Sequence, residues 1–395
     1  MSRKLLIVLF LCSLIPWILG NGLLPLLPIY ASQLGAGPGL VGAYLAISYL
    51  ALVLGSLGAG WISNRLQRRK LVLILAGALS VPAVWLMGQV SNAWELTILT
   101  VLVWFMGGLN LTLVSILTGL FAPQDERGRI FGTLALTGGL GALIGGLFIG
   151  AIVDRWGYPT LFAVLAVLMA FGPLLALLLE DKPGTLPERS IQKRGGADSL
   201  GGVFYLAILA TIIAGIALFV GRLGTSLSMH GLNLPRAAIT GTAAIGGLIA
   251  LPLTPLVGWL SDRYNRKLLL MLCYLACAAG LAILAVSTSL WQFWIASSLL
   301  SIHAYAGNGI GSALIADLVP SASLDTGLSI FSSANFAGGI VGFAFAGLAI
   351  QQFGLNTTFL GSMIVGLAAI GVLGLVRHER KATPLAEPGA AGSRA

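Results

Sequence analysis

Two nine-residue stretches decide the fold: GWISNRLQR at residues 60–68 and GWLSDRYNR at residues 258–266. Five of the nine positions are identical, and the two stretches lie 198 residues apart in a chain of 395. Further matches recur at an offset of 197 residues: Trp94 with Trp291, Pro123 with Pro320, Phe148 with Phe345, Gly150 with Gly347, Gly157 with Gly354, and Phe162 with Phe359. Because the offset stays constant to one residue over much of the chain, the sequence predicts two copies of one ancestral unit.

The composition indicates what kind of unit is repeated. Hydrophobic residues make up 57% of the chain and charged residues only 9%, with a mean hydropathy of +0.96. A soluble domain carries about 25% charged residues. This chain cannot cover itself with a normal water-soluble surface, so an ordinary cytosolic enzyme and a disordered chain are both excluded. A membrane protein that crosses the bilayer several times remains, with the lipid bilayer as its main partner.

The charge-free stretches give the number of spans. A membrane-spanning helix needs about 20 mostly apolar residues, and backbone polar groups in lipid must be satisfied within the helix. Six charge-free runs have the length of a single span. Three more are about twice as long and contain polar or Gly/Pro-rich breaks at residues 31–39, 287–292 and 351–356. The sequence therefore predicts an all-α membrane protein with twelve transmembrane helices.

The repeat divides these helices into two pseudo-symmetric six-helix bundles. We expect the N-terminal bundle at residues 1–180 and the C-terminal bundle at residues 199–377. The polar segment 181–198 is predicted to be a cytoplasmic linker, and residues 378–395 a cytoplasmic tail.

Lys and Arg residues predict the orientation, because cytoplasmic loops carry the excess of both. With the N-terminus in the cytoplasm, every one of the 22 Lys and Arg residues lies on the cytoplasmic side except Arg155, Arg222 and Arg236. Both termini are then cytoplasmic. We expect the protein to reside in the plasma (inner) membrane. The net charge of +9 is a signal of topology, and we expect no nucleic-acid partner. Arg222 is placed at the outer end of the seventh span, where it either extends to the interface or holds an anion.

The two repeated stretches resemble the motif G-x-L-x-D-R-x-G-R-[RK] of the major facilitator superfamily. The first copy reads Gly60, Ile62, Asn64, Arg65, Arg68 and Arg69, and the second reads Gly258, Leu260, Asp262, Arg263, Arg266 and Lys267. PQDERGRIFG at residues 123–132 is similar to the loop between helices four and five of the family. The resemblance covers roughly residues 5–376 and implies a secondary transporter that works by alternating access.

The resemblance also implies a conformational latch on the cytoplasmic side. A glycine permits close helix packing, and a carboxylate in the loop can cap a neighbouring helix. Asp262 would cap the fifth helix near Gly128, while Arg263 or Arg266 would pair with Asp317. The first copy has Asn64 in place of the acid, so that half of the latch should be weaker. The predicted latch residues are Gly60, Asn64, Arg65, Arg68, Gly258, Asp262, Arg263, Arg266 and Asp317. Alternatively, the arginines only follow the charge bias of cytoplasmic loops.

The resemblance places a cavity among helices one, four, seven and ten. By our span boundaries no Asp, Glu, Lys or Arg lies near the middle of a span. His303 does, about 12 residues or roughly 18 Å from the outer end of the tenth helix. His303 is our proton-coupling candidate, with a neutral structural His as the alternative. The other substrate-binding candidates, which could equally well hold helices together, are Asn21, Trp104, Asn110, Tyr305, Asn308 and Asn335.

The sequence predicts export of a small hydrophobic or weakly polar compound, driven most simply by protons. Two departures from the family's proton-driven exporters weaken this route: Trp104 stands where they carry Arg, and Ala142 where they carry Pro. The alternatives are uptake or facilitated diffusion of a neutral metabolite such as a sugar, and a non-transporting membrane receptor. We expect no enzyme, cofactor or metal, since the sequence has no Walker A, HExxH or GxSxG pattern. We expect a monomer.

Overall fold

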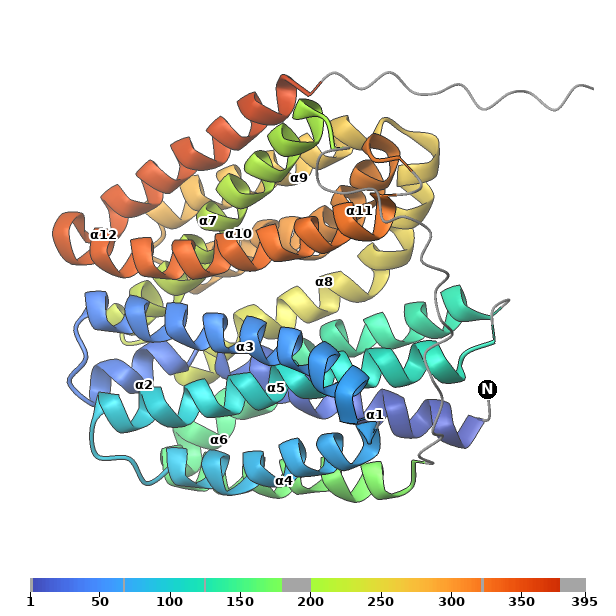
Figure 1. Cartoon of the computed structure of the whole chain (residues 1–395). Coiled ribbons are helices and arrows are strands. Elements are labelled where there is room, and N and C mark those ends of the chain that lie inside the picture. Colours follow the sequence, from blue (N-terminus) through green and yellow to red (C-terminus); the bar gives the residue numbers. More distant parts are fainter. Residues whose placement is uncertain (1–2, 67, 124–125, 180–199, 321–322, 377–395) are drawn as a thin grey trace, which may run out of the picture.

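The computed structural model describes residues 3–66, 68–123, 126–179, 200–320 and 323–376. Within these ranges the chain is nearly all helical and contains no strand (Figure 1). Nine of the described helices are long and apolar enough to cross a membrane. The prediction of an all-α, multi-pass membrane protein is therefore confirmed. The predicted linker at 181–198 and tail at 378–395 lie outside the described residues.

The helices of the first half are α1 (Arg3–Leu23), the short α2 (Leu27–Gln33), α3 (Pro38–Leu66), α4 (Arg69–Met87), α5 (Ala93–Phe121) and α6 (Arg127–Leu177). Those of the second half are α7 (Gly202–Gly231), α8 (Arg236–Arg263), α9 (Arg266–Ala285), α10 (Leu290–Ile302), the π-helical turn η2 (His303–Gly307), α11 (Asn308–Leu318) and α12 (Leu324–Gly374). In Figure 1 the helices of the second half lie together above those of the first half.

Two helices, α6 and α12, each run for 51 residues, twice the length needed for one span. Each is interrupted by one glycine with positive φ, Gly157 at 79° and Gly354 at 76°. Only glycine adopts this conformation without strain, so the chain turns at these two points. The predicted break at residues 351–356 is thus a single glycine within α12. The other two predicted breaks coincide with non-helical residues, at 34–37 and at 286–289.

Equivalent contacts in the two halves show that the repeat is structural. Lys70 Nζ at the start of α4 donates to the Leu177 carbonyl at 2.8 Å. Lys267 Nζ at the start of α9 donates to the Gly374 carbonyl at 2.7 Å. The partners in the second contact are those of the first shifted by 197 residues. We call the end of the molecule that holds these contacts the Arg266 end, and the opposite end, where α6 and α12 turn, the Gly157 end.

Small residues bring the helices together, as expected in lipid, where packing rather than the hydrophobic effect drives association. Gly55 of α3 and Gly108 of α5 lie against each other's helix so closely that a Cβ on either would overlap a backbone carbonyl, of Phe105 or of Leu52. The buried core extends through both halves, in one large cluster that contains residues of each.

Candidate substrate-binding site

Two adjoining hollows are partly open to solvent: one is lined by both halves, and the other by the first half alone. The Arg222 hollow has an empty volume of about 650 Å³ and is lined by α1, α7, α8, α10 and η2, together with residues of α2, α6 and α12. The Trp104 hollow, of about 560 Å³, is lined mainly by α1, α3 and α5. Asn21 and Leu24 line both. A small molecule in these hollows would touch residues from both halves of the chain.

Three of the predicted substrate-binding residues line these hollows. Asn21 lines both, Tyr305 lines the Arg222 hollow and Trp104 lines the Trp104 hollow. Asn21 also donates its amide N–H to the Gly138 carbonyl at 3.1 Å, which joins α1 to α6. One residue can therefore hold helices together and still face the cavity.

The three other predicted asparagines line neither hollow. Asn308 and Asn335 donate to carbonyls one turn earlier in their own segments, Ala304 at 2.9 Å and Phe331 at 3.1 Å. Asn110 is buried, and its Oδ1 has no hydrogen-bond partner among the described residues. The spacing along the spans predicts that all three lie near the middle of the membrane. Each lies on a face of its helix that does not line these hollows.

His303 also lies away from both hollows, inside the second half. Its ring meets Tyr274 edge-on, with centroids 5.0 Å apart, and is buried. A Cβ on Gly307 would lie 2.8 Å from Nδ1, so the glycine provides the space for the ring. Among the described residues Nδ1 has no hydrogen-bond partner. This placement favours the structural alternative over a relay exposed to the cavity.

Arg222 corrects the sequence analysis. Helix α7 continues to Gly231, so Arg222 lies about 13 Å before the end of its helix. It is half-buried and lines the Arg222 hollow. Our expectation of a cavity without charge was therefore wrong. The charge of Arg222 suggests the end of the seventh span, but the first helix-breaking signals, Asn233 and Pro235, come a further eleven residues on.

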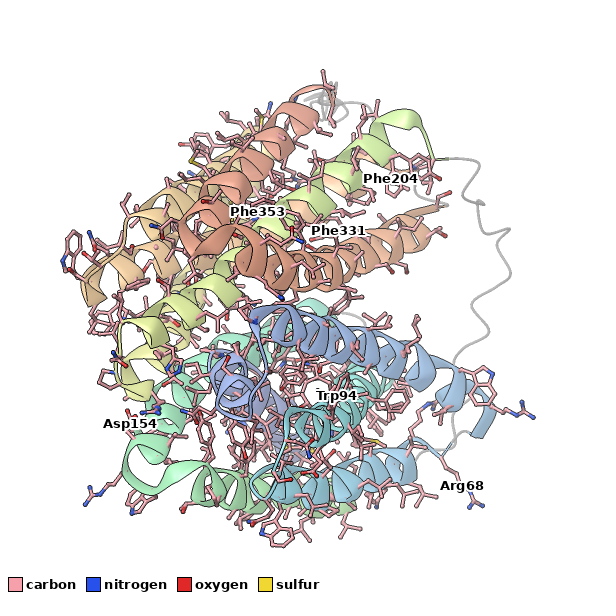
Figure 2. All side chains as sticks on the ribbon, turned by 90° about the vertical axis from the view of Figure 1, so that its left-hand side faces the viewer. Arg68, Trp94, Asp154, Phe204, Phe331 and Phe353 are labelled. Carbon is pink, nitrogen blue, oxygen red and sulfur yellow. The ribbon has the colours of Figure 1, made fainter. Side chains whose placement is uncertain are left out.

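At the Gly157 end, Asp154 of α6 caps the first turn of α8, in the other half of the chain. Its Oδ1 accepts from the Arg236 N–H at 3.0 Å and its Oδ2 from the Ala237 N–H at 2.8 Å. The Arg236 guanidinium lies 3.9 Å away. Figure 2 shows Asp154 where the two halves meet. A carboxylate here satisfies free N–H groups and interacts favourably with the helix dipole.

Gln351 makes the equivalent contact from the other half. Its Oε1 accepts from the Gly39 N–H in the first turn of α3, at 3.1 Å. Asp154 and Gln351 are 197 residues apart, so one cap of the pair is charged and the other is neutral. Nearby, Gly150 lies against the Arg236 carbonyl and Gly347 against the backbone of Gly42, too close in both cases for a side chain. The two halves are thus tightly joined at the Gly157 end.

A tyrosine of α2, Tyr30, also lies at this end, and it is buried. Tyr30 donates to the Met87 carbonyl at 3.0 Å and stacks on Tyr158, with ring centroids 4.1 Å apart. Loss of solvent raises the pKa of Tyr30 above its ordinary value. The hydroxyl therefore stays protonated as a donor.

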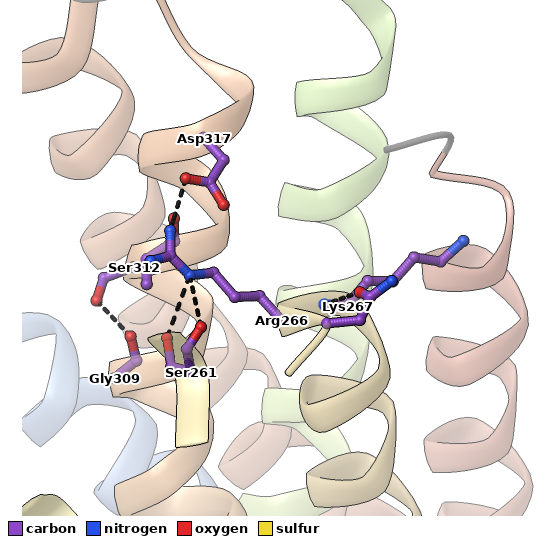
Figure 3. Close-up of polar contacts among 8 residues, drawn as sticks. Ser261, Arg266, Lys267, Gly309, Ser312 and Asp317 are labelled. Atoms are coloured by element: carbon purple, nitrogen blue, oxygen red, sulfur yellow. Dashed lines mark hydrogen bonds and ion pairs between the residues drawn. The ribbon is translucent and has the colours of Figure 1, made fainter. Parts of the chain in front are cut away.

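At the Arg266 end, the predicted pair between Arg266 and Asp317 is present (Figure 3). Nη1 lies 2.6 Å from Asp317 Oδ1, and Nε donates to the Ser261 Oγ at 3.2 Å. Both helices that it joins, α9 and α11, belong to the second half. The pair therefore stabilises one half and cannot by itself latch the two halves together.

The remaining predicted latch residues are placed as follows. Arg65 and Arg263 lie over Trp61 and Trp259, with 5.3 and 4.2 Å to the ring centroids. Arg68 is exposed and points away from the helices in Figure 2; α4 begins at Arg69, which makes Arg69 the counterpart of Arg266. A Cβ on Gly60 would meet open space, so the expected close approach at Gly60 is wrong. The side chains at Asn64, Gly258, Asp262 and Gly128 lie outside the described residues.

The described residues are nearly all helical, repeat one arrangement in the two halves and form a cavity lined by both, which is the architecture of a membrane transporter. The chain belongs to the major facilitator superfamily, whose family model matches residues 6–231 and 199–394. This confirms the resemblance seen in the sequence and makes the protein a transporter rather than an enzyme.

The chain is similar to several curated proteins and solved structures. The chain is 27% identical to the multidrug resistance protein MdtG of Klebsiella pneumoniae over 63% of each chain. It is 25% identical to MdtG of Enterobacter lignolyticus, over 92% of this chain and 89% of that one. It is also 25% identical to a gallate transporter of Pseudomonas putida, over 90% and 88%. The crystal structure of the nucleoside transporter NupG shares the fold, with a TM-score of 0.79 at 16% identity over 94% and 99%.

Proposed function

We propose that the chain is a secondary active transporter with twelve crossings in two pseudo-symmetric six-helix bundles. The turns at Gly157 and Gly354 support this count, because each would divide a 51-residue helix into two crossings. Helix α10, the η2 turn and α11 together would form one more. Added to the seven other long helices, these make six crossings in each half.

The substrate site opens towards the cytoplasm in this conformation. The caps formed by Asp154 and Gln351 join the halves at the Gly157 end, and the bias of Lys and Arg makes the Arg266 end cytoplasmic. Both termini then lie in the cytoplasm, and the protein resides in the plasma (inner) membrane. Alternating access would break these caps to release substrate on the outer side.

The transported compound is small, with a mainly apolar body, and it is exported. The observation that carries this proposal is the pair of largely apolar hollows that share Asn21, of which the Arg222 hollow is lined by both halves. The relatives named multidrug resistance protein support export. The relative named gallate transporter supports a small aromatic cargo. We propose proton coupling and a monomer, with no cofactor.

The test is flux in proteoliposomes. The full chain is reconstituted, and movement of 2-naphthoate and of 2-naphthamide is followed with and without an imposed pH gradient. We expect flux above that of empty liposomes, faster with the gradient. The variant Ala243→Trp, which fills the Arg222 hollow, should fold but not transport. Flux that ignores the gradient would remove proton coupling, and no flux of either compound would refute the transporter mechanism at this site.

A further inference from the structure

Arg222 is a fixed positive charge with no described counter-charge. A charged side chain at this depth in a span is costly unless it faces water or a partner. No ion pair of Arg222 exists among the described residues. Asp154 instead accepts from the backbone of α8, and Asp317 pairs with Arg266. Its charge is therefore available to the hollow that it lines.

The guanidinium is held in place by aromatic rings. Its Cζ lies 5.3 Å from the Phe219 ring centroid, and Phe219 in turn packs edge-on against Tyr49, with ring centroids 5.1 Å apart. Tyr49, Phe219 and Phe343 pack edge to face, with centroids 5.0 to 5.1 Å apart, and bring α3, α7 and α12 together around it. A guanidinium has five N–H donors in a rigid fork. No ion pair with a described residue occupies this fork at Arg222, which leaves donors for a ligand.

The rest of the wall is neutral. The polar groups beside Arg222 are hydroxyls, and Thr225 and Ser226 donate theirs to carbonyls of α7, of Gly221 at 2.7 Å and of Arg222 itself at 3.3 Å. The potential of the hollow is therefore set by one positive charge between low-dielectric walls, where Coulomb interactions are stronger than in water. Such a site repels a cation and attracts a single anionic group.

An apolar chamber continues from this charged site. The Trp104 hollow shares Asn21 and Leu24 with it, and Tyr49, which packs against Phe219, lines this second hollow. Trp17 and Trp104 provide aromatic surface there. A ligand with an anionic head and a flat apolar body fits both chambers at once.

We propose that Arg222 is the anion-binding residue of the substrate site and that the substrates are small amphiphilic monoanions, typified by aromatic carboxylates. The carboxylate takes two parallel hydrogen bonds from the guanidinium, and the ring lies towards Trp17 and Trp104. This inference rests on the proposed function, because it assumes that the two hollows hold the substrate.

The test uses three probes of one shape and different charge: 2-naphthoate, 2-naphthamide and 2-naphthylmethylammonium. Binding to the purified full chain in nanodiscs is measured by calorimetry. We expect naphthoate to bind at least tenfold more tightly than naphthamide, and the ammonium compound to bind most weakly. Arg222→Gln should abolish the preference for naphthoate while the affinity for naphthamide is kept, and Arg222→Lys should retain part of it.

Arg155→Gln is the matched control, since it removes the same charge from an exposed position beside Trp156. Equal affinities for naphthoate and naphthamide in the wild type, or equal effects of the two Gln variants, would overturn the proposal. If Arg222→Gln does not fold, the proposal is tested by the order of the three probe affinities in the wild type and by the preference that Arg222→Lys retains. Naphthamide flux without any charge preference refutes this site alone, whereas absence of all flux refutes the transporter mechanism.

Discussion

Replacing Asp154 by Asn should open the Gly157 end of the transporter. Both carboxylate oxygens accept backbone N–H groups at the start of α8, from Arg236 at 3.0 Å and Ala237 at 2.8 Å. Asn keeps one acceptor oxygen and loses the second, together with the charge. Because Asp154 lies in one half and α8 in the other, this loss weakens only the conformation in which the halves meet at this end.

The size of the effect follows from three terms. A charge at a helix N-terminus contributes about 0.3–1 kcal/mol when exposed and up to about 2 kcal/mol when partly buried. Loss of a capping hydrogen bond costs about 1 kcal/mol. The ion pair with Arg236 adds little, since its atoms are 3.9 Å apart and the two side chains are 37% and 27% exposed. We expect a total of about 1–2 kcal/mol, which shifts the equilibrium about 5- to 30-fold towards the open outer side.

The assay is labelling of a cysteine in the cavity from the outside. Thr242→Cys lines the Arg222 hollow, in a background without Cys12, Cys273 and Cys277. A membrane-impermeant maleimide reaches it in right-side-out vesicles only when the Gly157 end is open. We expect Asp154→Asn to accelerate labelling by the same 5- to 30-fold. Glu95→Gln is the control, because Glu95 accepts from Ser91 and Asn92 at the same end but within one half.

An unchanged labelling rate in folded Asp154→Asn protein would refute this reasoning. It would mean that the outer side is held closed by helix packing around Gly150 and Gly347 alone. An equal acceleration by Glu95→Gln would show that any lost carboxylate at this end loosens the protein, with no specific role for the cap.

Further predictions concern the pseudo-symmetric cap, the motif, the turns and the buried histidine. Gln351→Glu places a charge at the start of α3 and should slow the same labelling about two- to fivefold; faster labelling would contradict the cap. Arg266→Gln should lower the melting temperature more than Asp317→Asn, because it also loses the hydrogen bond to Ser261, and the double variant should be no worse than Arg266→Gln, with no change in labelling. Gly157→Ala should destabilise the protein by about 1–2 kcal/mol because of its positive φ, whereas the helical control Gly371→Ala, with open space at its Cβ, should not. His303→Gln should lower the melting temperature and leave the pH profile of flux unchanged; a lost pH dependence would instead identify a proton relay.

The overall fold could be predicted because its signals are spread over the whole chain. Long apolar runs, and a repeat with a constant offset, do not depend on any single residue. The same offset recurs in the structure, between the Lys70 and Lys267 contacts and between the turns at Gly157 and Gly354. The presence of breaks could be predicted, but not that α12 turns at one glycine, because a positive φ is a property of the folded backbone.

The binding site was predicted less well, because which face of a helix a residue occupies decides whether it lines a cavity. Asn21, Trp104 and Tyr305 line the hollows, whereas Asn308 and Asn335 bond within their own helical segments. A charge in an apolar run predicts the end of a span, yet Arg222 lies inside α7 and lines a hollow. By the same signal Asp154 marks only the boundary between two spans, although its contacts cross to the other half of the chain.

The repeat makes the Gly157 end chemically unequal. Asp154 and Gln351 occupy equivalent positions and cap equivalent helices, yet only Asp154 brings a charge to its cap. A charged acceptor binds a backbone N–H about twice as strongly as a neutral one. Opening of the outer side should therefore begin between α3 and α12, where the neutral cap is weaker, and end between α6 and α8. Spin-label distances across both pairs of helices would show this order as a larger spread of distances at the α3–α12 contact, and an equal spread would indicate that the halves separate as rigid bodies.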